Sequence, residues 1–158
     1  EVNGTVYFNI KKISDYGILS KHTQKEMIKL SKERGADPSD PQKKNPLDFI
    51  LWQKRKAGEP FWNSNWGEGR PGWHVECSAM LLDTLGDQID IHGGGKDLMF
   101  PHHESEIAQS ESYANIKPFV KTWMHVGTVN NKKEKNIHLT KKPHHIKKKW
   151  LTQTPDRH

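Results

Sequence analysis

The stretch that decides the fold runs from Gly69 to Glu106 and reads GRPGWHVECSAMLLDTLGDQIDIHGGGKDLMFPHHESE. It holds the only cysteine of the chain, Cys77, followed by a histidine and a glutamate four residues apart, His102 and Glu106. Residues four apart share one face of a helix, so His102 and Glu106 can close on one ion. A thiolate, an imidazole and a carboxylate form a donor set that zinc accepts. The stretch therefore predicts a zinc site and indicates chemistry on a small sulfur-containing substrate.

Simpler interpretations of these residues stay open at this point. A lone cysteine is most often a small buried apolar residue, and an isolated His–x₃–Glu pair is usually part of a helix surface. His103 competes with His102 as the ligand, although one step along a helix turns a side chain by about 100°. We expect that turn to point His103 away from Glu106, which favours His102.

Three glycines between the ligands indicate a nucleotide site. Gly93, Gly94 and Gly95 follow a short strand-like run and lack the side chains that keep a nucleotide away from the backbone. Asp97 follows them and could accept hydrogen bonds from ribose hydroxyls. A tight turn with a capping aspartate is the simpler alternative for these residues taken alone.

Apolar residues at helical spacing predict three helices, at residues 21–34, 73–85 and about 102–113. Gly35 and Gly86 end the first two, and Pro101 suits the first turn of the third, where its missing N–H is tolerated. The residues expected to face the core are Met27, Ile28 and Leu30 in the first helix and Val75, Ala79, Leu82 and Leu85 in the second.

Short apolar runs predict strands at residues 5–10, 47–52 and 89–92, the last of which feeds a turn at the glycines. A final pair is expected at residues 123–126 and 128–129, broken at Gly127. Residues 36–46 read as a loop, and residues 54–72 are expected to wrap the surface of the main sheet. Because a strand, a helix and a strand follow one another in the second half, we predict an α/β fold with a parallel sheet.

The charge of the chain is unevenly placed. The net charge is +6, but residues 131–158 alone hold eight lysines and one arginine against two acidic residues, so residues 1–130 carry a net charge of −1. Lysine runs of this kind are commonly solvated tails, although a specific RNA contact is the alternative. The basic balance therefore does not indicate a nucleic-acid surface on residues 1–130.

The composition favours an incomplete domain in a reducing compartment. Apolar residues make up 32% of the chain, below the ~45–50% usual for globular chains. One cysteine cannot form an internal disulfide. The sequence has no apolar run near the ~18 residues of a membrane span and opens with no secretory signal. We therefore expect a cytoplasmic protein, with an organelle matrix as the alternative.

Several segments closely resemble the central part of cysteinyl-tRNA synthetase, a class I aminoacyl-tRNA synthetase. They are GRPGWHVECSAM, DIHGGGKDLMFPHHESEIAQSE and WMHVG. TVYFNIKKISDYGILS and NPLDFILWQKRKAGEPFWNSNWGEGRPGW resemble the connective insertion that precedes that part. The resemblance covers roughly residues 5–135, far more than a chance motif.

The resemblance implies the second half of a class I Rossmann-like catalytic domain with part of its insertion. Residues 1–66 would belong to the insertion, residues 67–131 to the nucleotide-binding half with the zinc site, and residues 132–158 to a basic, irregular tail that departs from the family. The family's first half, with its HIGH motif and another zinc cysteine, would lie upstream. The helical domain that reads the anticodon would lie downstream, so we expect a central fragment.

The resemblance also implies an activity, in which ATP with Mg²⁺ activates L-cysteine for transfer to tRNA(Cys). In the family, another cysteine from upstream is a further zinc ligand, and the thiolate of the substrate itself binds the metal, which excludes serine. Trp73 would form a wall of the substrate pocket beside Cys77 and His102. His92 and His125 would line the nucleotide cleft together with the three glycines and Asp97.

The sequence departs from the family after Lys135. Lys135 keeps the first place of the KMSKS motif, whose lysines stabilise the leaving pyrophosphate, but the next four residues differ. We hypothesise a shift of reading frame there, which translation of the coding DNA in the other frames would test. The isolated chain is therefore expected not to aminoacylate. Two other functions stay open: a cysteine-activating ligase that acts on an amino-sugar, and a non-catalytic zinc-binding remnant.

Overall fold

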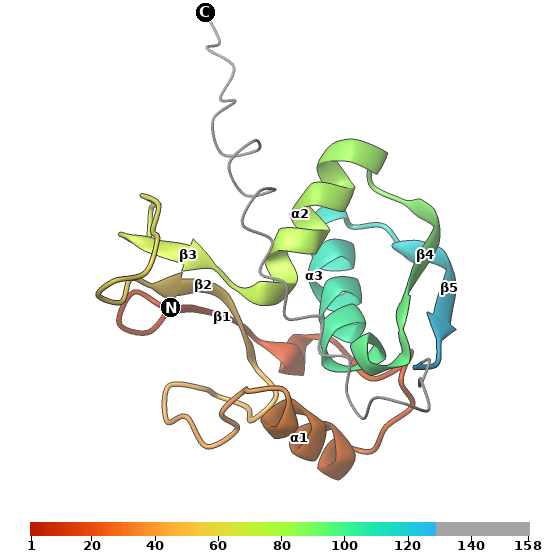
Figure 1. Cartoon of the computed structure of the whole chain (residues 1–158), viewed down its shortest axis with the longest axis horizontal. Helices are drawn as coiled ribbons and strands as arrows, with labels where there is room; N and C mark the ends of the chain where they lie inside the picture. Colours follow the sequence, from red (N-terminus) through yellow and green to blue (C-terminus); the bar gives the residue numbers. More distant parts are fainter. Residues whose placement is uncertain (129–158) are drawn as a thin grey trace, which may run out of the picture. The chain divides into compact units, whose positions relative to one another are not determined.

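The computed structural model describes residues 1–128, which form two sheets and the helices around them (Figure 1). The first sheet is antiparallel, in the order β1 (Val6–Phe8), β2 (Phe49–Lys54) and β3 (Gly69–Pro71). The second pairs β4 (Ile89–Gly95) with β5 (Val120–Val126) in parallel. The helices are α1 (Gln24–Glu33), α2 (Trp73–Leu85) and α3 (Glu104–Ala114). Short helical turns lie at Ile10–Lys12, Lys96–Leu98 and Met99–His103.

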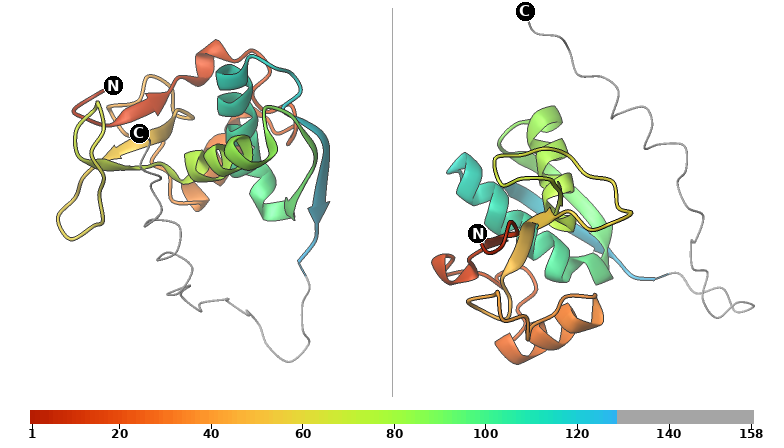
Figure 2. Two further views of the ribbon diagram at one scale, coloured as in Figure 1. Left: turned by 90° about the horizontal axis from the view of Figure 1, so that it is seen from above. Right: turned by 90° about the vertical axis from the view of Figure 1, so that its left-hand side faces the viewer.

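The predicted α/β arrangement is confirmed by the unit β4–α3–β5, in which a helix joins two parallel strands. Figure 1 and Figure 2 show α2 and α3 on one side of this sheet. Leu81 and Leu82 of α2 pack against Ile89, Phe119 and Val120 at the start of the two strands. On β4 and β5 several large side chains are exposed, including Ile91, Met124 and Val126, whereas His92 on β4 contacts Glu106 of α3. The sheet therefore carries its histidines on the face that the helices cover.

Three strand predictions differ from the structure. Residues 93–95 are the end of β4, paired with residues 124–126, and do not form a turn. The strand predicted at residues 123–126 begins earlier, because β5 runs from Val120 to Val126; it ends before Gly127 as predicted, and the second predicted segment, residues 128–129, reaches beyond the described residues. The short strand β3 lies within the stretch expected only to wrap the surface. Each difference comes from pairing with a distant strand, which supplies the backbone hydrogen bonds that local composition does not predict.

Helix α2 has the predicted bounds but a different buried face. Its buried residues are His74 and Ser78, whereas Ala79 and Leu85 are exposed, contrary to the prediction. The Gln109 side-chain amide on α3 donates to the carbonyl oxygen of His74 and to Ser78 Oγ, both at 2.6 Å. Hydrogen bonds between the helices thus compensate for the burial of polar groups on this face.

Helix α1 begins with a reciprocal capping box and packs on the main core. Thr23 Oγ1 accepts from the backbone N–H of Glu26, and the Glu26 carboxylate accepts from the backbone N–H of Thr23. The core residues come from the amino-terminal segment and from the third helical region: Ile10, Met27, Leu47, Phe49, Phe100 and Ala108. This core holds residues 1–54 against the start of α3.

Among the residues that the structure describes, no helix has the length and apolar character needed to cross a membrane.

Candidate metal and nucleotide site

The structure brings the three predicted zinc ligands together. Cys77 lies on α2, His102 in the turn before α3, and Glu106 in the first turns of α3. One ligand atom from each lies within 4.8 Å of the others. Helix α3 begins two residues later than predicted, but the preceding helical turn keeps His102 and Glu106 on one face, with His102 Nε2 2.9 Å from Glu106 Oε1.

Glu106 is the most deeply buried of the three candidate ligands. Its side chain is 0% exposed, and its second oxygen, Oε2, lies 3.2 Å from His92 Nε2. Within residues 1–128, neither carboxylate oxygen receives a well-aligned N–H, although both nitrogen–oxygen distances are short. These two contacts are therefore electrostatic and are not aligned hydrogen bonds. A buried carboxylate without aligned donors is unfavourable unless a cation balances it, so the residues present fit a metal ion.

The surroundings of His102 favour a positive charge on this side chain. Burial alone would lower the pKa of His102, but its interactions with Cys77 and Glu106 outweigh burial and raise that pKa to about 9. A proton on His102 Nε2 and a metal ion compete for the same lone pair. The site is therefore built to hold positive charge between a sulfur and a carboxylate.

His74 is a site residue that the sequence analysis missed. Its Nδ1 lies 2.9 Å from Nδ1 of His102, so it contacts the nitrogen of His102 that faces away from Glu106. Burial, together with the neighbouring His102, lowers the pKa of His74 to about 3 and keeps its imidazole neutral. A neutral His74 can accept the Nδ1–H of His102 and so fix the orientation of that ring. The one available signal was its place three residues before Cys77, on the same face of α2.

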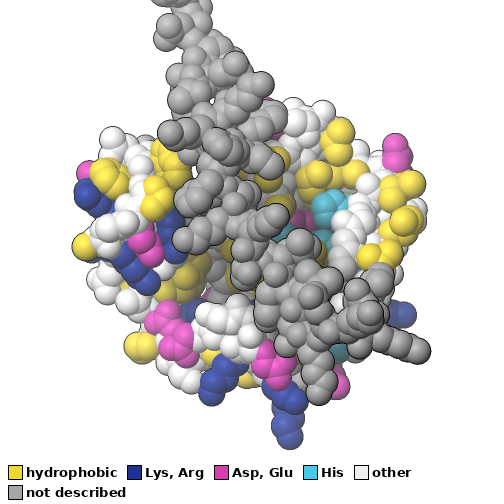
Figure 3. Space-filling view, viewed as in Figure 1, with side chains coloured by type: hydrophobic (Ala, Val, Ile, Leu, Met, Phe, Trp, Pro, Cys, Tyr) yellow, Lys and Arg dark blue, Asp and Glu magenta, His cyan; other side chains and the backbone are white. Residues whose placement is uncertain are grey.

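Trp73, predicted to form a wall of the substrate pocket, lies against His102. Its ring stacks on the His102 ring, with centroids 4.8 Å apart and 23° between the planes. It remains 49% exposed, so one part of the indole is free to contact a ligand. Figure 3 shows histidine side chains bordered by hydrophobic side chains on the face that it draws.

A second group of histidines surrounds the other side of Glu106. Ligand atoms of His92, His103 and Glu106 also lie within 4.8 Å of one another. His103 is buried, and its Nδ1 lies 2.8 Å from Nε2 of His125. Burial lowers the pKa of His103 to about 4 and also lowers the pKa of His125. His103 therefore belongs to this second group and not to the group that contains Cys77.

The residues expected at the nucleotide lie at the carboxyl end of β4. A Cβ added to Gly94 would lie 2.7 Å from Cε1 of His103, so this position has no room for a side chain. Asp97 lies in the short turn after the strand, with its side chain 56% exposed and 3.6 Å from Arg34. His92 and His125 lie on β4 and β5, and Lys135 lies outside the described residues. Ligands of α/β sheets bind at this end of the strands, so the position suits the expected role.

Comparison with known proteins gives the family. A family model described as the class I (C) tRNA synthetase catalytic domain matches residues 1–148. The chain belongs to this family. Its fold is accordingly that of a class I synthetase catalytic domain, in which β4, α3 and β5 supply the parallel α/β part.

Relatives in three bacteria are all named cysteine–tRNA ligase. That of Dehalococcoides mccartyi is 54% identical over 135 residues, which is 85% of this chain and 28% of the relative. That of Carboxydothermus hydrogenoformans is 55% identical over 135 residues, again 85% and 28%. That of Aquifex aeolicus is 56% identical over 128 residues, 81% of this chain and 25% of the relative. The chain thus spans about a quarter of the length of the curated relatives that it matches.

Proposed function

We propose that this chain is the zinc-binding and nucleotide-binding part of a cysteine–tRNA ligase, which uses ATP to activate L-cysteine and transfers it to tRNA(Cys). The single observation that carries the proposal is the convergence of Cys77, His102 and Glu106 within 4.8 Å, in a chain of the class I synthetase family. The names of the relatives support tRNA as the acceptor rather than an amino-sugar. A cytoplasmic location, as the sequence predicts, accompanies this proposal.

In this proposal Cys77, His102 and Glu106 hold zinc and leave one tetrahedral position for a further ligand. When bound, zinc supplies a Lewis acid that accepts the thiolate of cysteine far better than the hydroxyl of serine. Sites that depend on one specific polar contact discriminate by roughly 10⁴–10⁵. His74 orients His102 through the contact between their Nδ1 atoms, and Trp73 covers the His102 ring and excludes water from that side.

The nucleotide role rests on the end of β4. Adenosine would approach the backbone at Gly93, where an added Cβ would meet no atom closer than 3.6 Å, and Asp97 would accept from ribose hydroxyls beyond the strand end. His92 and His125 would line the same cleft. ATP would enter with Mg²⁺, and Lys135 would contribute positive charge at the phosphates.

Cobalt substitution tests this proposal on the 158-residue chain, prepared without added affinity histidines. A thiolate ligand gives Co²⁺ an intense near-ultraviolet charge-transfer band, so one equivalent of Co²⁺ should produce that band. L-Cysteine should intensify it by adding a second thiolate, and L-serine should leave it unchanged. The band should be absent in Cys77→Ser and weakened in His102→Ala.

The matched control is His22→Ala, which removes a half-buried histidine outside both histidine groups. Its cobalt spectrum should equal that of the unchanged chain. A cobalt complex without the sulfur band, or an equal response to cysteine and serine, would refute the assignment of Cys77 as a ligand that selects the substrate.

A further inference from the structure

We propose that His92, His103 and Glu106 form a second metal site, for a divalent transition cation, which shares Glu106 with the site that contains Cys77. This inference goes beyond the proposed ligase function and does not depend on it. It assigns to His103 a ligand role of its own and to Glu106 the role of a bridging carboxylate.

The two sites use different oxygens of one carboxylate. Glu106 Oε1 faces His102 Nε2 at 2.9 Å, and Oε2 faces His92 Nε2 at 3.2 Å. A carboxylate can bridge two cations through its two oxygens, and such paired ions lie about 3.5–4 Å apart in two-metal enzymes. A single ion bound beside Cys77 would leave Glu106 Oε2 buried, with only His92 Nε2 facing it.

Glu106 Oε2 itself points to a cation on this side. It is fully buried, and within residues 1–128 no N–H is aligned with it. His92 Nε2 lies 3.2 Å from this oxygen, but the pair does not have the geometry of a hydrogen bond. Two ligands of one metal ion lie close together with no proton between them. His92 Nε2 and Glu106 Oε2 have this arrangement.

Neighbouring side chains fix the positions of the two histidine rings of the second site. His103 Nδ1 is engaged by His125 Nε2 at 2.8 Å, which leaves Nε2 of His103 as its free ligand atom. Metal-binding histidines usually engage their other nitrogen in this way. Trp123 packs against both rings, with centroids 4.8 Å from His92 and 4.9 Å from His103. Gly94 makes room for the His103 ring, because a Cβ there would overlap its edge.

The donor set decides which ions fit. Two imidazoles and one carboxylate are the ligands of open catalytic zinc sites, which keep a position for water or a substrate. Nitrogen-rich sites favour Zn²⁺, Co²⁺ or Ni²⁺ over Mg²⁺ and Ca²⁺, which prefer oxygen. Two neighbouring cations repel each other and share the charge of one carboxylate, so the second ion should bind more weakly than the first.

Titration with Co²⁺ and with Zn²⁺ tests the second site on the 158-residue chain without added affinity histidines. The unchanged chain should bind two equivalents: a tight one with the sulfur charge-transfer band, and a weaker one with ligand-field bands only. His92→Gln and His103→Gln should each remove the weaker equivalent and keep the sulfur band. Cys77→Ser should lose the sulfur band and keep one equivalent bound by nitrogen and oxygen.

The outcomes separate the two proposals. One equivalent with a sulfur band and no second equivalent would overturn the second site and leave the Cys77 site intact. One equivalent without a sulfur band, removed by His92→Gln, would support the second site and contradict the Cys77 site. A second equivalent that survives both His92→Gln and His103→Gln comes from other histidines and would overturn the proposal.

Discussion

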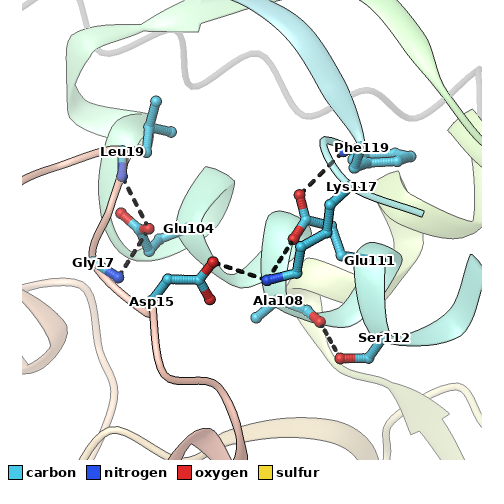
Figure 4. Close-up of polar contacts among 9 residues, drawn as sticks. All are labelled: Asp15, Gly17, Leu19, Glu104, Ala108, Glu111, Ser112, Lys117 and Phe119. Carbon is cyan, nitrogen blue, oxygen red and sulfur yellow. Dashed lines mark hydrogen bonds and ion pairs between the residues drawn. The ribbon is translucent and has the colours of Figure 1, made fainter. Parts of the chain in front are cut away.

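Glu104→Gln should destabilise the chain. Among the glutamates of α3, Glu104 should cause the largest loss of stability when it is replaced by glutamine. Glu104 is 1% exposed and is the first residue of α3, between His102 and Glu106 in the sequence. Its carboxylate accepts from the backbone N–H groups of Gly17 and Leu19 through Oε1, at 2.9 and 3.2 Å (Figure 4). Through Oε2 it also accepts from the backbone N–H of Ser20, at 2.9 Å. One side chain thus holds residues 17–20 against α3.

The magnitude follows from these three bonds. Glu104→Gln keeps one acceptor oxygen for two of them, but it converts both from charged to neutral bonds, a loss of about 1 kcal/mol each. The amide nitrogen then faces the N–H of Ser20 and leaves it without an acceptor, which costs about 1 kcal/mol or more. The free energy of unfolding should therefore fall by about 2–4 kcal/mol, a large part of the ~5–15 kcal/mol of a small domain.

Glu111→Gln is the matched control, because it makes the same chemical change near the other end of α3. Glu111 accepts one backbone N–H, that of Phe119 at 3.1 Å, and an exposed Lys117 at 3.4 Å (Figure 4). A glutamine can keep the backbone bond, so the loss should be about 1 kcal/mol or less.

Urea unfolding in the presence of a chelator gives both free energies without a contribution from metal binding. Amide hydrogen exchange should also speed up at Gly17, Leu19 and Ser20 in Glu104→Gln but not in Glu111→Gln. If Glu104→Gln loses no more stability than Glu111→Gln, the reasoning from the three backbone bonds is wrong.

Two further predictions concern the histidine groups. Gly94→Ala should displace His103 and weaken the second cobalt equivalent by about tenfold or more, whereas Gly93→Ala, whose added Cβ meets no atom closer than 3.6 Å, should leave it unchanged in the same titration. The metal-free chain should be most stable near pH 6.5. The pKa values of about 3 for His74 and about 4 for His103 make the unfolded chain the better proton acceptor below pH 6.5, so stability falls as the pH drops toward 3. The pKa of about 9 for His102 makes the folded chain the better proton acceptor above pH 6.5, so stability falls as the pH rises through 9. Urea unfolding midpoints measured across this pH range check both effects. His74→Gln should reduce the loss of stability at low pH, and His102→Gln should reduce the loss at high pH.

The sequence predicted the parts of the site whose spacing lies within one segment. The four-residue step from His102 to Glu106 and the glycine after Leu85 are local signals, and the structure has both the pairing and the helix end. The convergence of Cys77 was predictable only because zinc chemistry calls for a thiolate beside that pair. His74 was not predicted, because its role is defined by a ring that lies 28 residues away in sequence.

The glycine run shows why local composition misled the fold prediction. Three consecutive glycines are poor strand formers, and they predict a turn. In the structure they continue β4 because β5 pairs with them and because His103 needs the space above Gly94. The lack of a side chain serves close packing against an imidazole here, which a periodicity argument does not detect.

The buried face of helix α3 was also hard to predict from the local sequence. Its buried residues are mostly polar, and hydrophobic spacing alone would place them at the surface: Glu104, Ser105, Glu106, Gln109 and Ser110. Four of them contact residues that are distant in the sequence: Glu104 contacts residues 17–20, Ser105 contacts Tyr16, Glu106 contacts His92, and Gln109 contacts Ser78 on α2. Buried polar groups are tolerated only when partners reach them, so this helix can fold in place only when several segments converge on it. The buried polar residues of α3 hide its hydrophobic spacing in the sequence. The same residues bring the candidate metal ligands together in the structure.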